Sequence, residues 1–350
     1  MQQIAQRARH CDGRASGAVD ALIIGAGPVG LFGAYYAGFR GLTVAVLDSL
    51  PEPGGQVAAL YPDKQILDVA AHPTITGREL VTALLAQANA FAPTYLLGDS
   101  AARLSVSELG DEQVFEVETV TGRHVVCRSI VIAGGIGTFN PRRLPAAEQW
   151  QGAGVDYTVR ALEAYAGKRV VVVGGGDTAV DWALALSRAG AAVTLVHRTV
   201  RFRAHAASLE QLQCSAVQVR TNAIVTQIVG GSEVDGVVVR DLDGERTEAC
   251  DVVIPALGYI ADLKCFVGWG LAMSERRITV DSAMRTSRDG IYAAGDIVDY
   301  PGKVRLIAVG FGEVAIAVNN AANAIYPDLP VFPGHSTDRS AGERSHAKGA

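Results

Sequence analysis

A glycine-rich pattern close to the N-terminus constrains the fold of this chain more than any other feature. The apolar run Ala21–Ile24 ends in GAGPVG, a helical pattern follows to Gly41, and a second apolar run, Thr43–Leu47, ends on Asp48. Strand, glycine turn, helix, strand and acid, in this order, are the parts of a dinucleotide-binding βαβ unit. A glycine-rich turn that binds nothing is the alternative, and the complete context favours a dinucleotide.

Each part of this turn has a physical role. Gly25 fits the tight turn, Gly27 lets a pyrophosphate approach the backbone, and Gly30 lets the helix lie close to the strand. The helix that starts near Pro28 offers free N–H groups and the positive end of its dipole to phosphates. The carboxylate of Asp48 would accept a hydrogen bond from a ribose 2′-hydroxyl, which suits an adenosine without a 2′-phosphate.

The same pattern occurs a second time. The strand-like run Arg169–Val173 ends in GGGDTA, and a helix and a further strand follow. Where the first copy has Asp48, the second has His197 and Arg198, which would attract a 2′-phosphate that an acid repels. A solvated basic loop is the alternative. The candidate NADP(H) ligands are Gly174, Gly176, Asp177, Thr178, His197, Arg198 and Arg203, with Arg201 adding charge.

A third segment suggests that the chain returns to its first domain. GIYAAGD (290–296) is typical of a short strand that ends in a turn, and an apolar helix is expected over 304–324. Asp296 would accept hydrogen bonds from the ribityl hydroxyls of a flavin. We therefore predict an α/β protein with two doubly wound, Rossmann-like domains. The expected parts are tails 1–18 and 338–350, an FAD domain over 19–137 and 258–337, and an NADP domain over 138–257.

Composition limits the class of protein. The chain has 350 residues, which is enough for a large core. Its formal net charge is −5, which gives no sign of a nucleic-acid partner. No apolar run reaches the ~18 residues of a membrane span, and the first residues lack the apolar part of a secretory signal. The cysteines (Cys11, Cys127, Cys214, Cys250 and Cys265) include no CxxC or CxxxxC pair. This indicates a reduced, cytoplasmic chain without a dithiol centre or a metal site.

Taken in order, the motifs resemble the thioredoxin-reductase superfamily of flavoproteins. They are GxGPxG, PGGQ, LYP, GGGDTA, HR…FRAH and IYAAGD. The cysteine pairs of thioredoxin and glutathione reductases are absent from 154–160 and 53–60. The chain is most similar to ferredoxin–NADP⁺ reductases of the thioredoxin-reductase-like type. The segments that carry this resemblance are 60–73, 174–184, 302–321 and the tail FPGHST (332–337).

The resemblance implies an FAD site and a homodimer. Tyr61 would stack on one face of the isoalloxazine ring, and His335, from the partner subunit, would cover the other face. These two are the candidate catalytic residues, through stacking and gating. The implied FAD ligands are Gly25, Gly27, Pro28, Gly30, Asp48, Gly55, Gln56, Tyr61, Ala101, Phe139, Asp296, His335, Ser336 and Thr337.

The implied activity is electron transfer between ferredoxin or flavodoxin and NADP(H), with FAD carrying the chemistry. Arg142-Arg143 and Arg276-Arg277 are candidate contacts for an acidic ferredoxin. Thr199 stands where many relatives have a second arginine, so the preference for NADP over NAD stays open. The alternatives are an NAD(P)H oxidase, diaphorase or quinone reductase, and a flavin redox sensor without turnover.

Overall fold

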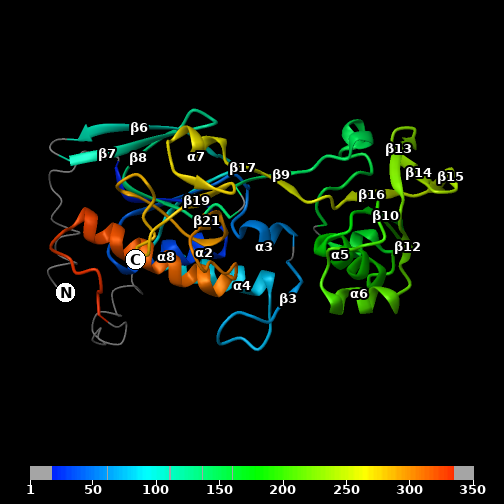
Figure 1. The fold of residues 1–350 in the computed structure, drawn as a ribbon, viewed down its shortest axis with the longest axis horizontal. Coiled ribbons are helices and arrows are strands. Elements are labelled where there is room, and N and C mark those ends of the chain that lie inside the picture. Colours follow the sequence, from blue (N-terminus) through cyan, green and yellow to red (C-terminus); the bar gives the residue numbers. More distant parts are fainter. Residues whose placement is uncertain (1–17, 61, 110–111, 136, 160, 335–350) are drawn as a thin grey trace. The chain divides into compact units, whose positions relative to one another are not determined.

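The computed structural model describes residues 18–60, 62–109, 112–135, 137–159 and 161–334, and they form two compact units (Figure 1). Unit 1 comprises the described residues of 1–139 and 261–350, and unit 2 comprises those of 140–260. The chain therefore leaves unit 1, builds unit 2 and returns. The sequence predicts domain boundaries after residues 137 and 257, and the two units divide after residues 139 and 260.

Unit 1 is built on one seven-stranded sheet with the order β5-β2-β1-β8-β7-β6 and with β20 paired to β8. β1, β2, β5, β8 and β20 run parallel, whereas β6 and β7 are antiparallel additions. The sequence predicts separate strands at 124–127 and 129–133, but β8 is continuous because it pairs along its length with β7 and β1. The strands are β1 (Val19–Ile24), β2 (Val44–Asp48), β5 (Thr94–Leu97), β6 (Ala101–Leu109), β7 (Glu112–Thr119), β8 (His124–Ile132) and β20 (Ile291–Ala293).

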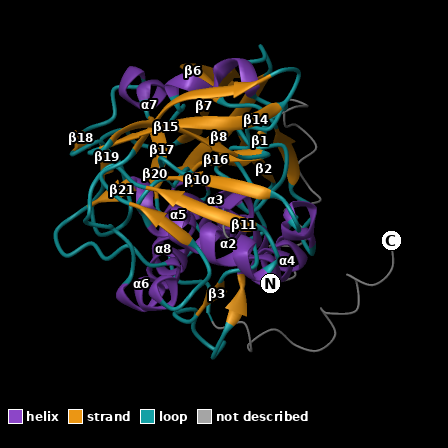
Figure 2. Ribbon diagram, turned by 90° about the vertical axis from the view of Figure 1, so that its right-hand side faces the viewer, coloured by secondary structure: helices purple, strands orange, loops and turns teal. Residues whose placement is uncertain are grey.

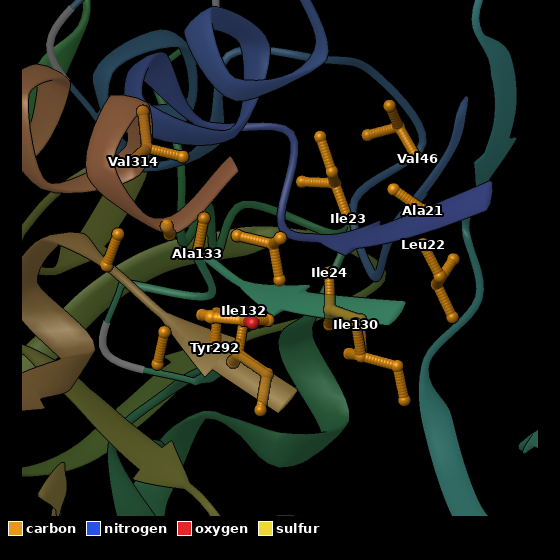
Figure 3. Packing of buried hydrophobic residues seen from close by; sticks show 14 of the residues in the cluster. Ala21, Leu22, Ile23, Ile24, Val46, Ile130, Ile132, Ala133, Tyr292 and Val314 are labelled. Carbon is orange, nitrogen blue, oxygen red and sulfur yellow. The ribbon is translucent and has the colours of Figure 1, made fainter. Parts of the chain in front are cut away.

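Three helices pack together in unit 1: α2 (Pro28–Phe39), α4 (Gly77–Asn89) and α8 (Ile307–Ile325) (Figure 1). Figure 3 shows Ile23 pointing to the same side as α2, while Leu22 and Ile130 point to the opposite side. Both faces of the parallel strands are therefore buried, which explains the continuous apolar run Ala21–Ile24 in β1. A side chain on Gly33 would overlap Val314, so α2 and α8 approach closely.

The remaining elements of unit 1 are short. The composition of 49–56 predicts a loop, but a helix, α3, begins at Gly55 within this segment. These elements are α3 (Gly55–Leu60), β3 (Gln65–Ile66), β4 (Ile75–Thr76), α7 (Lys264–Gly268), β18 (Met273–Ser274), β19 (Arg277–Thr279), the 3₁₀ turn η3 (Gly295–Ile297) and β21 (Val298–Asp299). At the boundary of the units, β9 (Thr138–Pro141) pairs with β17 (Tyr259–Asp262).

Unit 2 has a parallel sheet, β12-β11-β10-β16, and a separate antiparallel sheet, β13-β14-β15. Figure 2 shows β10 and β11 of the parallel sheet side by side. Its helix α5 (Asp177–Arg188) contacts β10, β11 and α6. The second glycine motif therefore lies between β10 and α5, as the first lies between β1 and α2. The other elements are η1 (Pro145–Trp150), η2 (Leu162–Tyr165), β10 (Arg169–Val173), β11 (Ala192–Val196), α6 (Ala206–Gln213), β12 (Gln218–Arg220), β13 (Ile224–Gly230), β14 (Val234–Asp241), β15 (Gly244–Ala249) and β16 (Val252–Pro255).

Candidate functional site

The glycine turn of unit 1 contains two positions, Gly25 and Gly30, at which only glycine fits. Gly25 has a φ of 113°, and a Cβ atom there would lie 2.4 Å from the carbonyl oxygen of Ala133. A Cβ atom on Gly30 would lie 1.8 Å from the carbonyl oxygen of Gly25. The main-chain N–H of Gly25 donates to the carbonyl of Leu47 at 2.8 Å, so the turn begins where β1 and β2 end.

The N-terminus of α2 has the properties of an anion site. Gly27 is the N-cap, Pro28 is in the first turn, and neither a side-chain cap nor an acidic residue neutralises this end of the helix. The loop before α3 packs against it, because Gly54 N–H donates to the carbonyl of Ala26 at 2.8 Å. A Cβ atom on Gly55 would lie 2.9 Å from the Cα atom of Gly27. Backbone N–H groups and the positive end of the dipole thus remain available for phosphates.

Asp48, at the end of β2, is 9% exposed and holds the turn. Its carboxylate accepts a hydrogen bond from Ala26 N at 2.5 Å and one from Leu50 N at 2.8 Å. Burial raises the pKa of Asp48, although these two hydrogen bonds act in the opposite direction. The residue therefore has a role in orienting the turn that the sequence did not reveal, in addition to its predicted role toward a ribose.

Several predicted FAD ligands can be located only in part. Gln56 is the second residue of α3, and its Nε2 atom lies 3.1 Å from the Cβ position of Gly135, just after β8. Ala101 is buried at the start of β6. Phe139 lies in β9, but its side chain is not described. Tyr61, His335, Ser336 and Thr337 lie outside the described residues.

The third predicted segment returns to the first glycine turn. Gly295 follows β20, and the side chain of the next residue, Asp296, is exposed. A Cβ atom on Gly310, in α8, would lie 2.5 Å from Val29 Cγ2 and 3.5 Å from the Cα atom of Gly295. The beginnings of α2 and α8 and the 295–296 turn therefore meet at one place in unit 1.

A buried charged group beneath this turn was missed by the sequence analysis. Glu313 accepts hydrogen bonds from Gly295 N at 2.7 Å and from Tyr300 Oη at 2.6 Å, and its carboxylate pairs with Lys303. The Lys303 and Glu313 side chains are 3% and 4% exposed. Glu313 is the single charged residue in the apolar sequence of α8, and that is the signal that could have revealed it.

The glycine turn of unit 2 repeats the construction. A Cβ atom on Gly174 would lie 2.3 Å from the carbonyl oxygen of Ala256, and Gly174 N–H donates to Val196 O at 3.0 Å. Gly176 is the N-cap of α5 and has no side-chain cap. Open space lies where a Cβ atom on Gly176 would point, so a ligand can approach the backbone there.

His197 packs against this turn. Its ring occupies the space that a side chain on Gly175 would need, with Cε1 2.1 Å from that Cβ position. The ring lies 4.8 Å from the ring of Phe202 and donates from Nε2 to the carbonyl of Arg201 at 3.1 Å. Thr199 Oγ1 lies 3.1 Å from the same nitrogen, so Thr199 helps to hold the ring.

Asp177 has a different position from the other predicted NADP ligands. Its carboxylate accepts a hydrogen bond from His205 N at 2.9 Å, and it is not among the residues that line the pocket described below. Arg203 N–H donates to the carbonyl of Gly175 at 2.7 Å. Together these contacts fasten the 201–205 loop to the glycine turn and to the start of α5.

A pocket of about 790 Å³ opens at this turn. Gly174, Gly175, Gly176, Thr178 and His197 line it, and of the described residues that line it none is acidic. Its arginines are Arg142, Arg143, Arg198, Arg201 and Arg203. The sequence predicts Arg142 and Arg143 as ferredoxin contacts, but both residues lie in the wall of this pocket. A site with this charge suits a ligand with several phosphates.

The described cysteines do not form a redox pair. None of the described cysteines, Cys127, Cys214, Cys250 and Cys265, forms a disulfide. Burial raises the pKa of Cys127 and of Cys250 to about 12, so these thiols are unreactive near neutral pH. Within the described ranges no three His, Cys, Asp or Glu side chains are grouped as metal ligands, and no helix has the length and apolar character to cross a membrane.

Comparison with known proteins agrees with this geometry. The family described as pyridine nucleotide-disulphide oxidoreductase matches residues 19–321. A protein of Nocardioides sp. named ferredoxin–NADP reductase is 51% identical over 323 residues, which are 92% of this chain and 98% of that protein. One of the same name from Frankia alni is 53% identical over 321 residues, 91% of this chain and 99% of that protein.

Solved structures show the same architecture. The thioredoxin reductase of T. acidophilum matches 88% of this chain and 98% of its own, with a TM-score of 0.71 and 26% identity. The thioredoxin reductase of Lactococcus lactis matches 88% of this chain and 99% of its own, with a TM-score of 0.72 and 25% identity. The predicted fold, two Rossmann-like domains of which the first is discontinuous, is confirmed, and the chain belongs to the pyridine nucleotide-disulphide oxidoreductase family.

Proposed function

We propose that this chain is a ferredoxin–NADP reductase, an enzyme that transfers electrons between ferredoxin or flavodoxin and NADP(H). Unit 1 binds FAD and unit 2 binds NADP(H). When bound, FAD supplies the chemistry that connects single-electron carriers with hydride transfer to a nicotinamide. The relatives that are named ferredoxin–NADP reductase support this proposal, because they match this chain over nearly their whole length.

One observation carries the assignment of the two nucleotides. The same glycine turn occurs in both units, but it is followed by a buried carboxylate, Asp48, in unit 1 and by an arginine-rich pocket in unit 2. A carboxylate beside a ribose disfavours a 2′-phosphate, whereas arginines bind one with charge-assisted hydrogen bonds. Unit 1 therefore suits FAD, which has no 2′-phosphate, and unit 2 suits NADP(H).

The residues of unit 1 fit FAD. The uncapped start of α2 provides N–H groups for a pyrophosphate, and the close approach of Gly55 to Gly27 leaves backbone rather than side chains at this place. Asp48 and Asp296 are suitable acceptors for sugar and ribityl hydroxyls. Tyr61 and His335 remain the proposed stacking residues, and Ser336 and Thr337 remain proposed ligands beside His335.

Arg142 and Arg143 are reassigned in this proposal from ferredoxin docking to nucleotide binding. Both line the pocket of unit 2 with Gly174 and His197. Replacing each by Gln should raise the KM for NADPH about tenfold and leave the KM for ferredoxin within about twofold. Arg276→Gln is the matched control, because Arg276 is exposed in unit 1 and belongs to the other candidate docking pair. A rise in the ferredoxin KM alone, for the Arg142 and Arg143 variants, would contradict the reassignment.

The proposed setting is a homodimer in the cytoplasm. The described cysteines form no disulfide, which suits a reducing compartment. The resemblance of the C-terminal tail to that of ferredoxin–NADP⁺ reductases supports a partner subunit that supplies His335. Light scattering of the FAD-bound protein should give the mass of two chains. Mixed dimers that carry one His335→Ala subunit should then retain one unaffected flavin site, whereas a monomer of full activity would contradict this part of the proposal.

The experiment that tests the activity compares electron acceptors. The purified protein with bound FAD is reduced by NADPH without oxygen and is then mixed with ferredoxin, with a quinone or with air. We expect turnover with ferredoxin to be about tenfold faster or more than turnover with quinone or oxygen. Fast turnover with quinone or oxygen alone would identify an oxidase or quinone reductase. A flavin that NADPH does not reduce would identify a redox sensor.

A further inference from the structure

A buried ion pair lies beneath the 295–296 turn, and nothing in the proposed reaction so far requires it. The Lys303 side chain contacts Glu313 Oε1, to which Tyr300 Oη also donates, and the Lys303 Nζ atom lies 5.6 Å from the centre of the Tyr300 ring. The other carboxylate oxygen, Oε2, accepts from Gly295 N. Three donors therefore hold this carboxylate in place.

Such a pair is costly to bury. Taking a carboxylate and an ammonium group out of water has a large desolvation cost, which their attraction offsets only when the geometry is good. An apolar pair would pack in the same space without this cost. The charges therefore point to a role in specificity or positioning, and the residues that they contact indicate where that role lies.

The pair contacts the turn at which the flavin is proposed to bind. Glu313 binds the backbone of Gly295, which precedes the exposed carboxylate of Asp296. Glu313 also lies one turn after Gly310, where a Cβ atom would meet Val29 of α2 and the Cα atom of Gly295. A displacement of the Glu313 carboxylate would therefore move the 295–296 turn relative to the starts of both helices.

We propose that Glu313, Lys303 and Tyr300 form a positioning site for the flavin: Glu313 holds the Gly295–Asp296 turn, and Lys303 balances the charge of Glu313. This inference rests on the proposed binding of FAD to unit 1. Glu313 and Lys303 are positioning residues, since they act through the turn. Their charges also act on the flavin electrostatically, because water screens buried charges only weakly.

The test uses Glu313→Gln, Lys303→Met and the double variant, as FAD-bound proteins. The matched control is Glu116→Gln, which makes the same exchange in unit 1 at a carboxylate that contacts His124 Nδ1 at 2.8 Å on the surface. Two quantities are measured: the dissociation constant of FAD by fluorescence titration, and the midpoint potential of the bound flavin by dye-coupled titration. Neither depends on ferredoxin turnover.

We expect Glu313→Gln to weaken FAD binding about tenfold and the control to change it less than about twofold. Reduction adds negative charge to the flavin. An unbalanced Lys303 in Glu313→Gln should therefore raise the midpoint potential, an unbalanced Glu313 in Lys303→Met should lower it, and the double variant should lie between them. A structural defect alone would not give shifts of opposite sign.

The proposal is overturned if both single variants bind FAD as the unchanged protein does, or if their potentials shift in the same direction. If a single variant does not fold, the double variant decides, because it leaves no unbalanced charge: FAD binding weakened about tenfold supports the proposal, and unchanged binding overturns it. Bleaching of the unchanged protein by NADPH is recorded in parallel. Its failure would count against the proposed enzyme function, whereas the FAD titration alone tests the positioning site.

Discussion

The carboxylate of Asp48 accepts a hydrogen bond from the main-chain N–H of Ala26 at 2.5 Å, so the acid at the end of β2 holds the first glycine turn. In unit 2 the equivalent place has His197, whose ring packs on Gly175 and leaves the charge of the site to arginines. Two copies of one fold thus differ in the sign of the charge beside the glycine turn. This difference underlies the proposed division between FAD and NADP(H).

Replacing Asp48 by Ala should destabilise unit 1. The N–H groups of Ala26 and Leu50 would each lose an acceptor, and a buried donor without a partner costs about 1–3 kcal/mol. Asp48→Asn keeps one oxygen and should lose less. Urea denaturation of both variants measures these effects, and equal stability of Asp48→Ala and the unchanged protein would show that Asp48 does not hold the turn.

Replacing Gly175 by Ala should disturb unit 2 through His197. The new Cβ atom would lie 2.1 Å from His197 Cε1, so the ring must move, with an expected cost of about 1–3 kcal/mol. In a His197→Ala background the same exchange should cost much less. Gly231→Ala is the control, because open space lies at that position. A double-mutant cycle by urea denaturation measures the coupling, and additive effects would refute the contact.

Replacing Arg198 by Gln should reduce the preference for NADPH. The loss of a charge-assisted hydrogen bond to a 2′-phosphate corresponds to about 1.5–3 kcal/mol, or roughly tenfold to a hundredfold in the dissociation constant. Binding of NADH should change little, since it has no 2′-phosphate. Titration of the FAD-bound protein with both nucleotides measures this selectivity, and an equal loss for NADH would assign Arg198 to another part of the nucleotide.

Stability at acid pH should depend in part on Asp251, which pairs with Arg169 at 2.6 Å between β16 and β10. The hydrogen bond from the Arg169 side chain lowers the pKa of Asp251 to about 2 from an ordinary value of 3.8. A depressed pKa means that the pair contributes stability above about pH 4 and loses it as the pH falls to about 2. The effect should be small, because both side chains are partly exposed and solvent screens them.

Thermal unfolding of Asp251→Asn between pH 2 and pH 7 tests this expectation. The variant and the unchanged protein should differ above pH 4 and converge near pH 2. Asp243→Asn is the control at a side chain that is 91% exposed. A difference that persists unchanged at pH 2 would mean that Asp251 acts through packing rather than through its charge.

The sequence was sufficient for the βαβ units because their requirements are local. Gly25, Gly30 and Gly174 each lie where a Cβ atom would strike the backbone, so the pattern of glycines predicts the turns directly. The return of the chain at Gly295 was also visible, because the short strand before it ends in a turn. The pairing of β20 with β8 joins segments far apart in sequence, and no local pattern could assign that partner.

The parts of the site that were not predicted depend on contacts at a distance. Arg142 was visible as a basic residue, but its position in the pocket follows from the fold of unit 2. Glu313 and Lys303 are ten residues apart, and their pairing depends on the path of the chain between β21 and α8. The position of Asp177 in the second glycine motif predicts a contact with NADP(H). Its carboxylate accepts a hydrogen bond from the main-chain N–H of His205, a contact that the motif does not reveal.

The most direct test of the proposed function is rapid mixing of the FAD-bound protein with NADPH and then with oxidised ferredoxin, without oxygen, while the flavin absorbance is recorded. The account predicts that NADPH bleaches the flavin band and that ferredoxin restores it as the ferredoxin itself becomes reduced. A flavin that NADPH leaves oxidised, or a reduced flavin that ferredoxin leaves bleached, would contradict it.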